Sequence, residues 1–173
     1  MILFFLFITF LTDVHSESLS DVIFHFADFK KTYGYLPEGV FLGGSVKQAD
    51  FVFSDIQFVK EKGFYRFLIE AEGNQDAELS SIPRFPAFHL NLDSKRKQMI
   101  VTFFGSSKIE VDLNSLRKRI LKSPLVHDVE FYPRLEDDRW TFTLYLKKKY
   151  PIEVYELKSP SRLVIDMSTR AVH

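Results

Sequence analysis

The side chains with the clearest binding chemistry lie on strand-like stretches near the C-terminus. Arg162 and Asp166 flank the apolar run of "SPSRLVIDMS", and Arg139 opens "RWTFTLYLK". A guanidinium offers paired donors to a carboxylate, and a carboxylate accepts hydrogen bonds from hydroxyl groups. These three residues are therefore candidates to bind hydroxyl-rich or anionic ligands, such as glycans or peptide carboxylates.

The same charges also have a structural interpretation. In an extended strand, residues i and i+4 lie about 13 Å apart, so Arg162 and Asp166 would find partners on neighbouring strands rather than pair with each other. Such pairs would fix the rim of a sheet, or the charges would keep an edge strand from pairing with another chain. The sequence leaves the structural and the ligand-binding alternatives open.

Three tyrosines, Tyr132, Tyr145 and Tyr155, fall on the polar phase of the C-terminal strands. An exposed aromatic ring combines an apolar face with a polar hydroxyl group, which suits stacking on a sugar. The three rings are therefore candidates for a binding platform. The alternative is that a second layer of structure, such as an N-terminal helix, covers them.

Residue types that carry catalysis or bind metals are absent or scattered. The chain has no Cys, and its five His residues form no known ligand spacing. It contains no GxSxG motif and no phosphate-binding loop. With 23 basic and 23 acidic residues, it has no net charge to attract nucleic acid. We therefore predict a non-enzymatic protein that needs neither a metal nor a cofactor and does not bind nucleic acid.

The N-terminus is apolar-rich over its first eleven positions, "MILFFLFITFL", and then turns polar. This run is too short to span a bilayer comfortably, and its length suits the apolar part of a signal peptide. We predict a signal peptide over residues 1–16 and a mature protein that is peripheral to a membrane at most. No Lys or Arg precedes the run, so a buried strand is the alternative.

Two segments of different character follow the leader. Residues 18–33 place Val22, Ile23, Phe26 and Phe29 at helical spacing, and Gly34 can end the helix. The Gly- and Pro-rich "YLPEGVFLGGSVKQ" is typical of a loop. Residues 17–48 are therefore expected to form an N-terminal helix and a linker.

From residue 49 to residue 168 the apolar residues alternate with a period of two, which indicates half-buried strands. One helix interrupts them, capped by Asp112 and ended near Ser123-Pro124. Short strands separated by turn residues favour an all-β fold. We predict an antiparallel β-sandwich of two similar sheets with one N-terminal helix and one connecting helix.

The sandwich shows signs of an internal repeat. Shifting the chain by 73 residues superposes residues 55–93 on residues 128–166 and places Arg66 on Arg139. Apolar residues keep the same phase on three strands of each unit, and a slip of one residue would turn each set outward. We interpret the two segments as copies of one β unit, each closed by its last strand.

The C-terminal part of the chain resembles the AMIN domain. This domain precedes the catalytic part of bacterial N-acetylmuramoyl-L-alanine amidases and also occurs in type IV pilus secretins. Its closing motif is roughly Pro-Pro-Arg-Leu-Val-Ile/Val-Asp-Leu, which is matched here by Pro160, Arg162, Leu163, Val164, Ile165 and Asp166. Arg139 matches an arginine that opens the preceding apolar strand of the family. The resemblance covers residues 126–168, and the first copy departs by placing His89 where the second has Arg162.

The resemblance implies a periplasmic protein that binds peptidoglycan or an envelope protein complex and has no chemistry of its own. The candidate arginines, aspartate and tyrosines would then contact the cell wall. A different class of function remains open, namely an envelope scaffold whose strand edge pairs with a strand of another chain.

Overall fold

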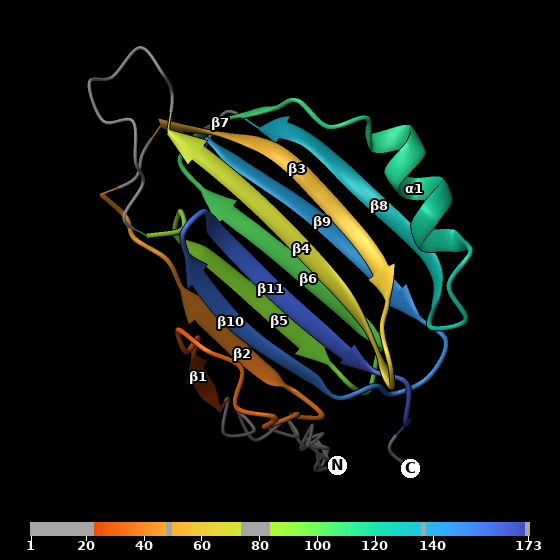
Figure 1. Cartoon of the computed structure of the whole chain (residues 1–173). Coiled ribbons are helices and arrows are strands. Elements are labelled where there is room, and N and C mark those ends of the chain that lie inside the picture. The colour runs from red at the N-terminus through yellow and green to blue at the C-terminus, as the bar shows by residue number, and fades with distance from the viewer. Residues whose placement is uncertain (1–22, 48–49, 74–83, 136–137, 172–173) are drawn as a thin grey trace, which may run out of the picture.

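The computed structural model describes residues 23–47, 50–73, 84–135 and 138–171. The expected signal peptide, residues 1–16, and the start of the expected N-terminal helix lie outside the described residues. The described chain forms two sheets packed face to face, which confirms the all-β sandwich (Figure 1).

The larger sheet, called sheet A, has six strands. In spatial order these are β1 (Phe24–Phe26), β2 (Gly39–Gly43), β5 (Phe88–Asp93), β6 (Gln98–Phe104), β9 (Arg139–Leu146) and β8 (Val126–Leu135). Sheet B has five strands. In spatial order these are β10 (Ile152–Lys158), β11 (Ser161–Ser168), β4 (Phe64–Gly73), β3 (Asp50–Lys60) and β7 (Ser106–Ile109). The pairs β1–β2 and β3–β7 are parallel, so both sheets are mixed rather than antiparallel throughout.

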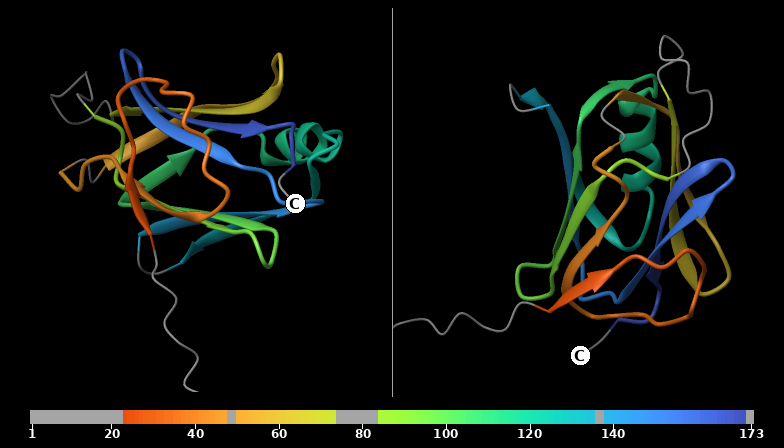
Figure 2. Two further views of the ribbon diagram at one scale, coloured as in Figure 1. Left: turned by 90° about the horizontal axis from the view of Figure 1, so that it is seen from below. Right: turned by 90° about the vertical axis from the view of Figure 1, so that its left-hand side faces the viewer.

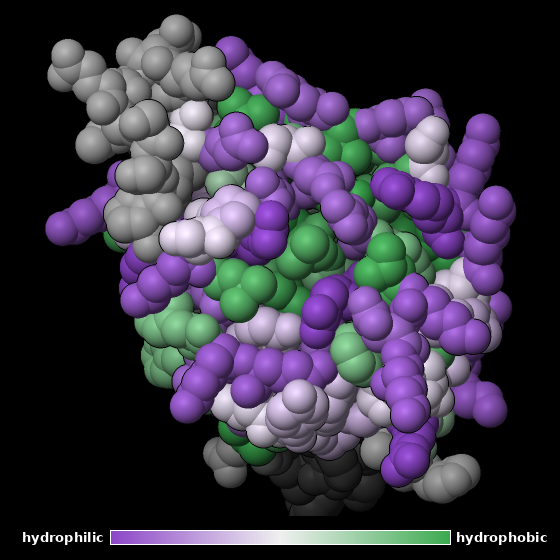
Figure 3. Space-filling view, viewed as in Figure 1, coloured by the Kyte–Doolittle hydropathy of each residue, from purple (hydrophilic) through white to green (hydrophobic). Residues whose placement is uncertain are grey.

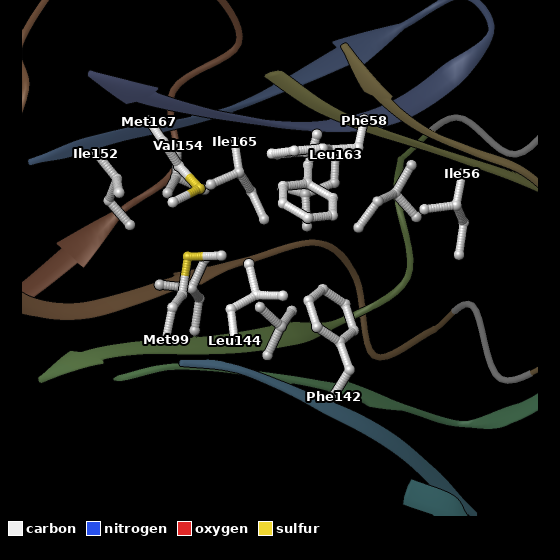
Figure 4. Packing of buried hydrophobic residues seen from close by; sticks show 14 of the residues in the cluster. Ile56, Phe58, Met99, Phe142, Leu144, Ile152, Val154, Leu163, Ile165 and Met167 are labelled. Atoms are coloured by element: carbon white, nitrogen blue, oxygen red, sulfur yellow. The ribbon is translucent and has the colours of Figure 1, made fainter. Parts of the chain in front are cut away.

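The core lies between the two sheets. Because side chains alternate along a strand, one face of each strand points into this core. Side chains of sheet B such as Phe58 and Ile165 point toward Phe142, Leu144 and Met99 of sheet A (Figure 4). All five are buried. Each such side chain contributes about 1.5–3 kcal/mol on leaving water, so this interface stabilises the fold and leaves the outer faces available for function.

The predicted connecting helix is confirmed as α1 (Leu113–Leu121). The Asp112 carboxylate accepts hydrogen bonds from the backbone N–H groups of Asn114 and Ser115, which have no partner inside the helix. Leu116 and Ile120 are one turn apart and fully buried. The helix packs beside β8 and β3, at the side of the sandwich (Figure 1).

The predicted N-terminal helix is wrong for the described residues. Phe24–Phe26 is the strand β1, and residues 27–38, which we call the strap, contain no helix. Aromatic residues favour strands over helices, and β1 gains a hydrogen-bonded partner in β2. The strap runs from the layer of sheet A to that of sheet B (Figure 2).

The expected linker also contains a strand. Gly39–Gly43 forms β2, which pairs with β1 on one side and β5 on the other. Phe41 points into the core and is 3% exposed. The sandwich therefore includes residues before position 49. Gly39 and Gly43, the end residues of β2, made this stretch resemble a loop in the sequence. Pairing with β5, far along the chain, stabilises it as a strand.

Two sets of four strands follow the same path through the sandwich. Sheet A contains the order β5-β6-β9-β8 and sheet B the order β10-β11-β4-β3, so β3 to β6 correspond to β8 to β11. The repeat with a constant shift of 73 residues is not confirmed. It equates β5 with β11, whereas β5 lies between β2 and β6 and its counterpart by strand order is β10.

Candidate functional site

The six predicted site residues do not form one site. Leu163 and Ile165 point into the core, so alternation places Arg162 and Asp166 on the outer face of sheet B. Tyr155 lies on the same outer face, opposite Val164. The other three residues, Arg139, Tyr132 and Tyr145, lie on the outer face of sheet A. The two groups are on opposite sides of the sandwich.

Asp166 is the centre of a buried ionic cluster. Its side chain is 0% exposed. Arg66 on β4 donates from Nε and Nη2 to its two oxygens, at 2.7 and 2.9 Å, and Lys31 of the strap donates from Nζ at 2.5 Å. Paired donors of this kind make strong, charge-assisted hydrogen bonds. Both oxygens of Asp166 are therefore occupied by the protein itself.

The Asp166 carboxylate raises the pKa values of the two cations that bind it, Arg66 and Lys31. The hydrogen bond to Asp166 raises the pKa of Arg66 above its usual value, against the effect of burial. Burial alone would lower the pKa of Lys31, but its hydrogen bonds to Asp166 and Tyr35 outweigh that effect and raise it. Both groups stay charged at any ordinary pH.

Tyr155 completes the cluster. Its ring is 4% exposed, and its hydroxyl oxygen accepts a hydrogen bond of 2.9 Å from Nη2 of Arg66. Burial raises the pKa of Tyr155 to about 12. The alternative prediction, that a second layer of structure covers the tyrosines, is therefore correct for Tyr155. The covering layer is the extended strap rather than a helix.

Hydrogen bonds hold the strap in place. Glu153, 3% exposed, accepts at Oε1 from the backbone N–H groups of Thr32 and Tyr33, at 2.5 and 2.7 Å. Leu36 and Ile152 exchange two backbone hydrogen bonds of 2.8 Å along the outer edge of β10. This part of the face is closed, so Asp166 and Tyr155 have a structural role.

Arg162 lies beyond the strap and pairs across the strands. Its Nε donates to Oε2 of Glu70, the residue opposite on β4, at 2.6 Å. The expectation that Arg162 and Asp166 each find a partner on a neighbouring strand is confirmed. Figure 3 shows the molecule from the side of sheet B, where polar groups (purple) break the apolar surface (green) into small patches. Among the described residues, this side therefore offers no wide apolar docking surface.

The outer face of sheet A is organised differently. Glu130 lies between the two predicted tyrosines, and its Oε2 accepts from the hydroxyl groups of Tyr132 and Tyr145, at 2.5 and 2.8 Å. Tyr132 is 40% exposed. These bonds, Tyr132 first, lower the pKa of Glu130, and the bond to Glu130 raises the pKa of Tyr145. One carboxylate thus fixes two rings on adjacent strands.

The surroundings of this pair, which we call the tyrosine clamp, are polar and include the ion pair of Asp128, opposite Tyr145, with Arg117 at 2.6 Å. Thr102 and Thr141 share a hydrogen bond of 3.0 Å on the same face. The guanidinium of Arg139 lies 6.0 Å from the ring centroid of Phe104. Among the described elements, none packs over this face, and α1 contacts β8 and β3 only at the side. The face is a platform of rings, hydroxyl groups, the carboxylates of Glu130 and Asp128, and two arginines, Arg117 and Arg139.

Glu130 was missed from the sequence, although a signal existed. It stands two residues before Tyr132 and therefore shares its face of β8. The link to Tyr145 depends on the register of β8 against β9, which places Glu130 opposite Thr143. A pattern within one strand does not reveal that register.

The described residues include no group of three or more His, Asp or Glu side chains that could hold a metal ion. Within that same part of the chain, no helix is both long enough and apolar enough to cross a membrane. A scan against protein-family models and a search of curated proteins each found no match for this chain.

Proposed function

We propose that this chain is a non-catalytic domain of the bacterial cell envelope that acts in the periplasm and binds peptidoglycan on the outer face of sheet A. The observation that carries the proposal is the tyrosine clamp, in which Glu130 fixes Tyr132 and Tyr145 on an uncovered sheet face. The resemblance of residues 126–168 to the AMIN domain supports it. That domain has the same general architecture of two packed sheets.

Rigid rings are suited to glycan binding because little side-chain entropy remains to be lost. A tyrosine immobilised before the ligand arrives avoids an ordering cost of about 0.5–1.5 kcal/mol per side chain. The ring faces offer apolar area to a sugar, while Thr141 and Thr102 offer hydroxyl groups beside them. Arg139, at the start of β9, can receive the carboxylates of peptide stems.

The test is a pull-down on purified peptidoglycan sacculi. We expect the full chain to be retained and the double variant Tyr132→Ala, Tyr145→Ala to lose retention at least about tenfold, equivalent to ~1.4 kcal/mol. Tyr33→Ala is the matched control, because Tyr33 is 76% exposed but belongs to the strap on the other side. It should be retained like the unchanged chain.

Two results would overturn wall binding through this face. One is a lack of retention of the unchanged chain, and the other is equal retention of the double variant and the Tyr33→Ala control. Urea unfolding of each variant shows whether the fold survives the substitutions. Wall binding that persists without the clamp would move the site to another surface.

A second candidate function is a protein contact through a strand edge, as in an envelope scaffold. The observation in its favour is β1, the edge strand of sheet A, whose Phe24 and Phe26 are 59% and 79% exposed. Capture of a defined strand-donating protein, together with no retention on sacculi, would favour this candidate over wall binding.

A further inference from the structure

Three of the four sheet edges are protected against pairing with another chain. At β8, Arg117 of α1 donates a hydrogen bond to the backbone oxygen of Val129. At β10, Leu36 of the strap takes the backbone groups of Ile152. The short strand β7 carries the exposed charge of Lys108. Blocking groups, short length and lysines are the usual means by which natural proteins protect an edge.

The fourth edge, β1, is also short, at three residues, but among the described residues it carries neither a blocking group nor a charge. Its sequence is Phe24-His25-Phe26, with no Lys, Arg, Asp, Glu or Pro. Figure 1 shows β1 as the outermost strand of its sheet. Three of the large apolar side chains exposed in the described residues lie in this strand or directly before it, namely Ile23, Phe24 and Phe26. An apolar, uncharged edge of this kind is a template for strand pairing.

The backbone of β1 determines which groups are available. The oxygen of Ile23 accepts from N–H of Val40 at 3.1 Å, and N–H of Ala27 donates to the oxygen of Leu42 at 2.8 Å. Odd-numbered residues therefore bond to β2. By alternation, the N–H and C=O groups of Phe24 and Phe26 point away from β2. In the described part of the chain these four groups have no partner strand.

We propose that β1 pairs in antiparallel fashion with β1 of a second copy of this chain, about a two-fold axis at His25. This inference rests on the second candidate function, the strand-edge contact, and names its partner. Phe24 then lies opposite Phe26 of the partner subunit, and Phe26 opposite Phe24 of the partner subunit. Each of these pairs exchanges two backbone hydrogen bonds, so the four outward groups of each copy are satisfied.

The chemistry of the edge favours a second copy over a foreign strand. A two-fold axis brings each residue near its own copy, so a charged strand would repel itself, and β1 carries no fixed charge. The two phenylalanines lie symmetrically about His25, so the same register places phenylalanine opposite phenylalanine twice. Cross-strand aromatic pairs of this type stabilise antiparallel sheets.

A cysteine crosslink tests the register directly. The chain contains no Cys, so His25→Cys introduces a single thiol. Position 25 would form a non-hydrogen-bonded pair with its own copy, with Cα atoms about 4.5 Å apart, and this separation is within disulfide range. We expect the full chain carrying His25→Cys to form a covalent dimer under mild oxidation. Tyr33→Cys, at a more exposed position off the axis, should stay monomeric.

Sedimentation equilibrium gives the independent measurement. We expect the unchanged chain to be dimeric, and Phe24→Ser with Phe26→Ser to weaken association at least about tenfold. Phe26→Pro should do the same, because it removes an N–H that faces outward while sparing the bonds to β2. The control Phe29→Ser removes an exposed phenylalanine, 45% exposed, outside β1 and should leave the dimer intact.

The proposal fails if the unchanged chain is monomeric at hundreds of micromolar, or if both edge variants associate like the control. It also fails if Tyr33→Cys crosslinks as readily as His25→Cys. If β1 instead pairs with a strand of a different protein, this chain would be monomeric by itself and would form a mixed complex only when that other protein is added. Retention on sacculi depends on the other end of sheet A, so its loss and loss of the dimer are separate results.

Discussion

The two outer faces of the sandwich each carry an arginine, in opposite surroundings. Arg66 lies on β4 and Arg139 on β9, two strands with corresponding places in the strand order, and each lies opposite a residue of the neighbouring strand. Opposite Arg66 is Asp166, buried beneath the strap, whereas opposite Arg139 is Phe104, which is 38% exposed. One arginine is locked by a carboxylate, and the other is held over a ring on an open face.

This difference shows what a covering segment changes. Removing charges from water is costly, and only a fully hydrogen-bonded partner offsets that cost. Under the strap, Asp166 receives three such bonds, from two cations. On sheet A, Arg139 and Tyr132 of the tyrosine clamp are exposed, so water reaches both side chains. The closed face is a structural element, and the open face is the candidate site.

The largest expected effect comes from removing the residue opposite each arginine, Asp166 on the covered face and Phe104 on the open face. Asp166→Ala removes the carboxylate that Arg66 and Lys31 share. The side chains of these two cations are only 26% and 16% exposed. We expect a loss of about 3–5 kcal/mol of unfolding free energy, as for other broken buried pairs. The corresponding Phe104→Ala should cost less than about 1 kcal/mol, because its ring is already partly in water.

Urea unfolding of the two variants gives both numbers. Similar losses from Asp166→Ala and Phe104→Ala would show that the strap does not make the two positions different. Hydrogen exchange offers a local check, because faster exchange of strap amides in the Asp166→Ala protein is expected even where global unfolding is unchanged.

The second largest effect is expected at alkaline pH, which should lower the free energy of unfolding through the groups under the strap. The folded protein raises the pKa of Tyr155 to about 12, above the usual 10.0, and also raises that of Lys31 above 10.5. The folded state therefore holds protons that the unfolded state releases, so the stability from these groups is complete below about pH 10 and is lost as pH rises toward 12. Tyr155→Phe should lose less stability between pH 8 and pH 11.

Urea midpoints across that pH range measure the effect, with Tyr33→Phe as the control on the same side of the protein. A tyrosine titration by ultraviolet absorbance sharpens the contrast between faces. Glu130→Ala removes the hydrogen bond that contributes most to the raised pKa of Tyr145 and should bring the ionisation of Tyr145 to lower pH. The buried Tyr155 should still ionise near pH 12 in that variant, and a parallel shift of both tyrosines would contradict separate causes.

The smallest effect belongs to the pair of Arg162 and Glu70, outside the strap. The two side chains are 31% and 20% exposed and meet at 2.6 Å. Because solvent screens them, a double-mutant cycle with Arg162→Ala and Glu70→Ala should give a coupling of about 0.2–1 kcal/mol. A coupling near that of the buried cluster would show that cover by the strap is not the deciding factor.

Local patterns were enough to predict most strands and α1, because alternation and an N-cap are written in neighbouring residues. The connecting helix follows from Asp112 and from the spacing of Leu116 and Ile120. The strap and β2 could not be predicted in this way. Phe26 and Phe29 also fit helical spacing, and only pairing with distant strands decides between the two states.

The candidate site was predictable only in part. The tyrosines of the clamp were identified by their phase, whereas their separation from Tyr155 depends on which sheet each strand joins. Lys31 and Glu153 were missed because their partners lie 135 and 121 residues away. Arg66 and Arg139 were aligned only by the 73-residue shift, which is not confirmed, and the residues opposite them, Asp166 and Phe104, needed the register of two strand pairs.

The bond between Lys31 and Asp166 has a consequence for how the chain is made. During synthesis on the ribosome the strap emerges early, and its anchor on β11 follows 135 residues later. Until then β4 has no neighbour on that side, and the strap has no surface to rest on. The edge of β4 therefore stays unpaired until β11 has been translated, and in this interval the nascent chain is most exposed to mispairing at β4.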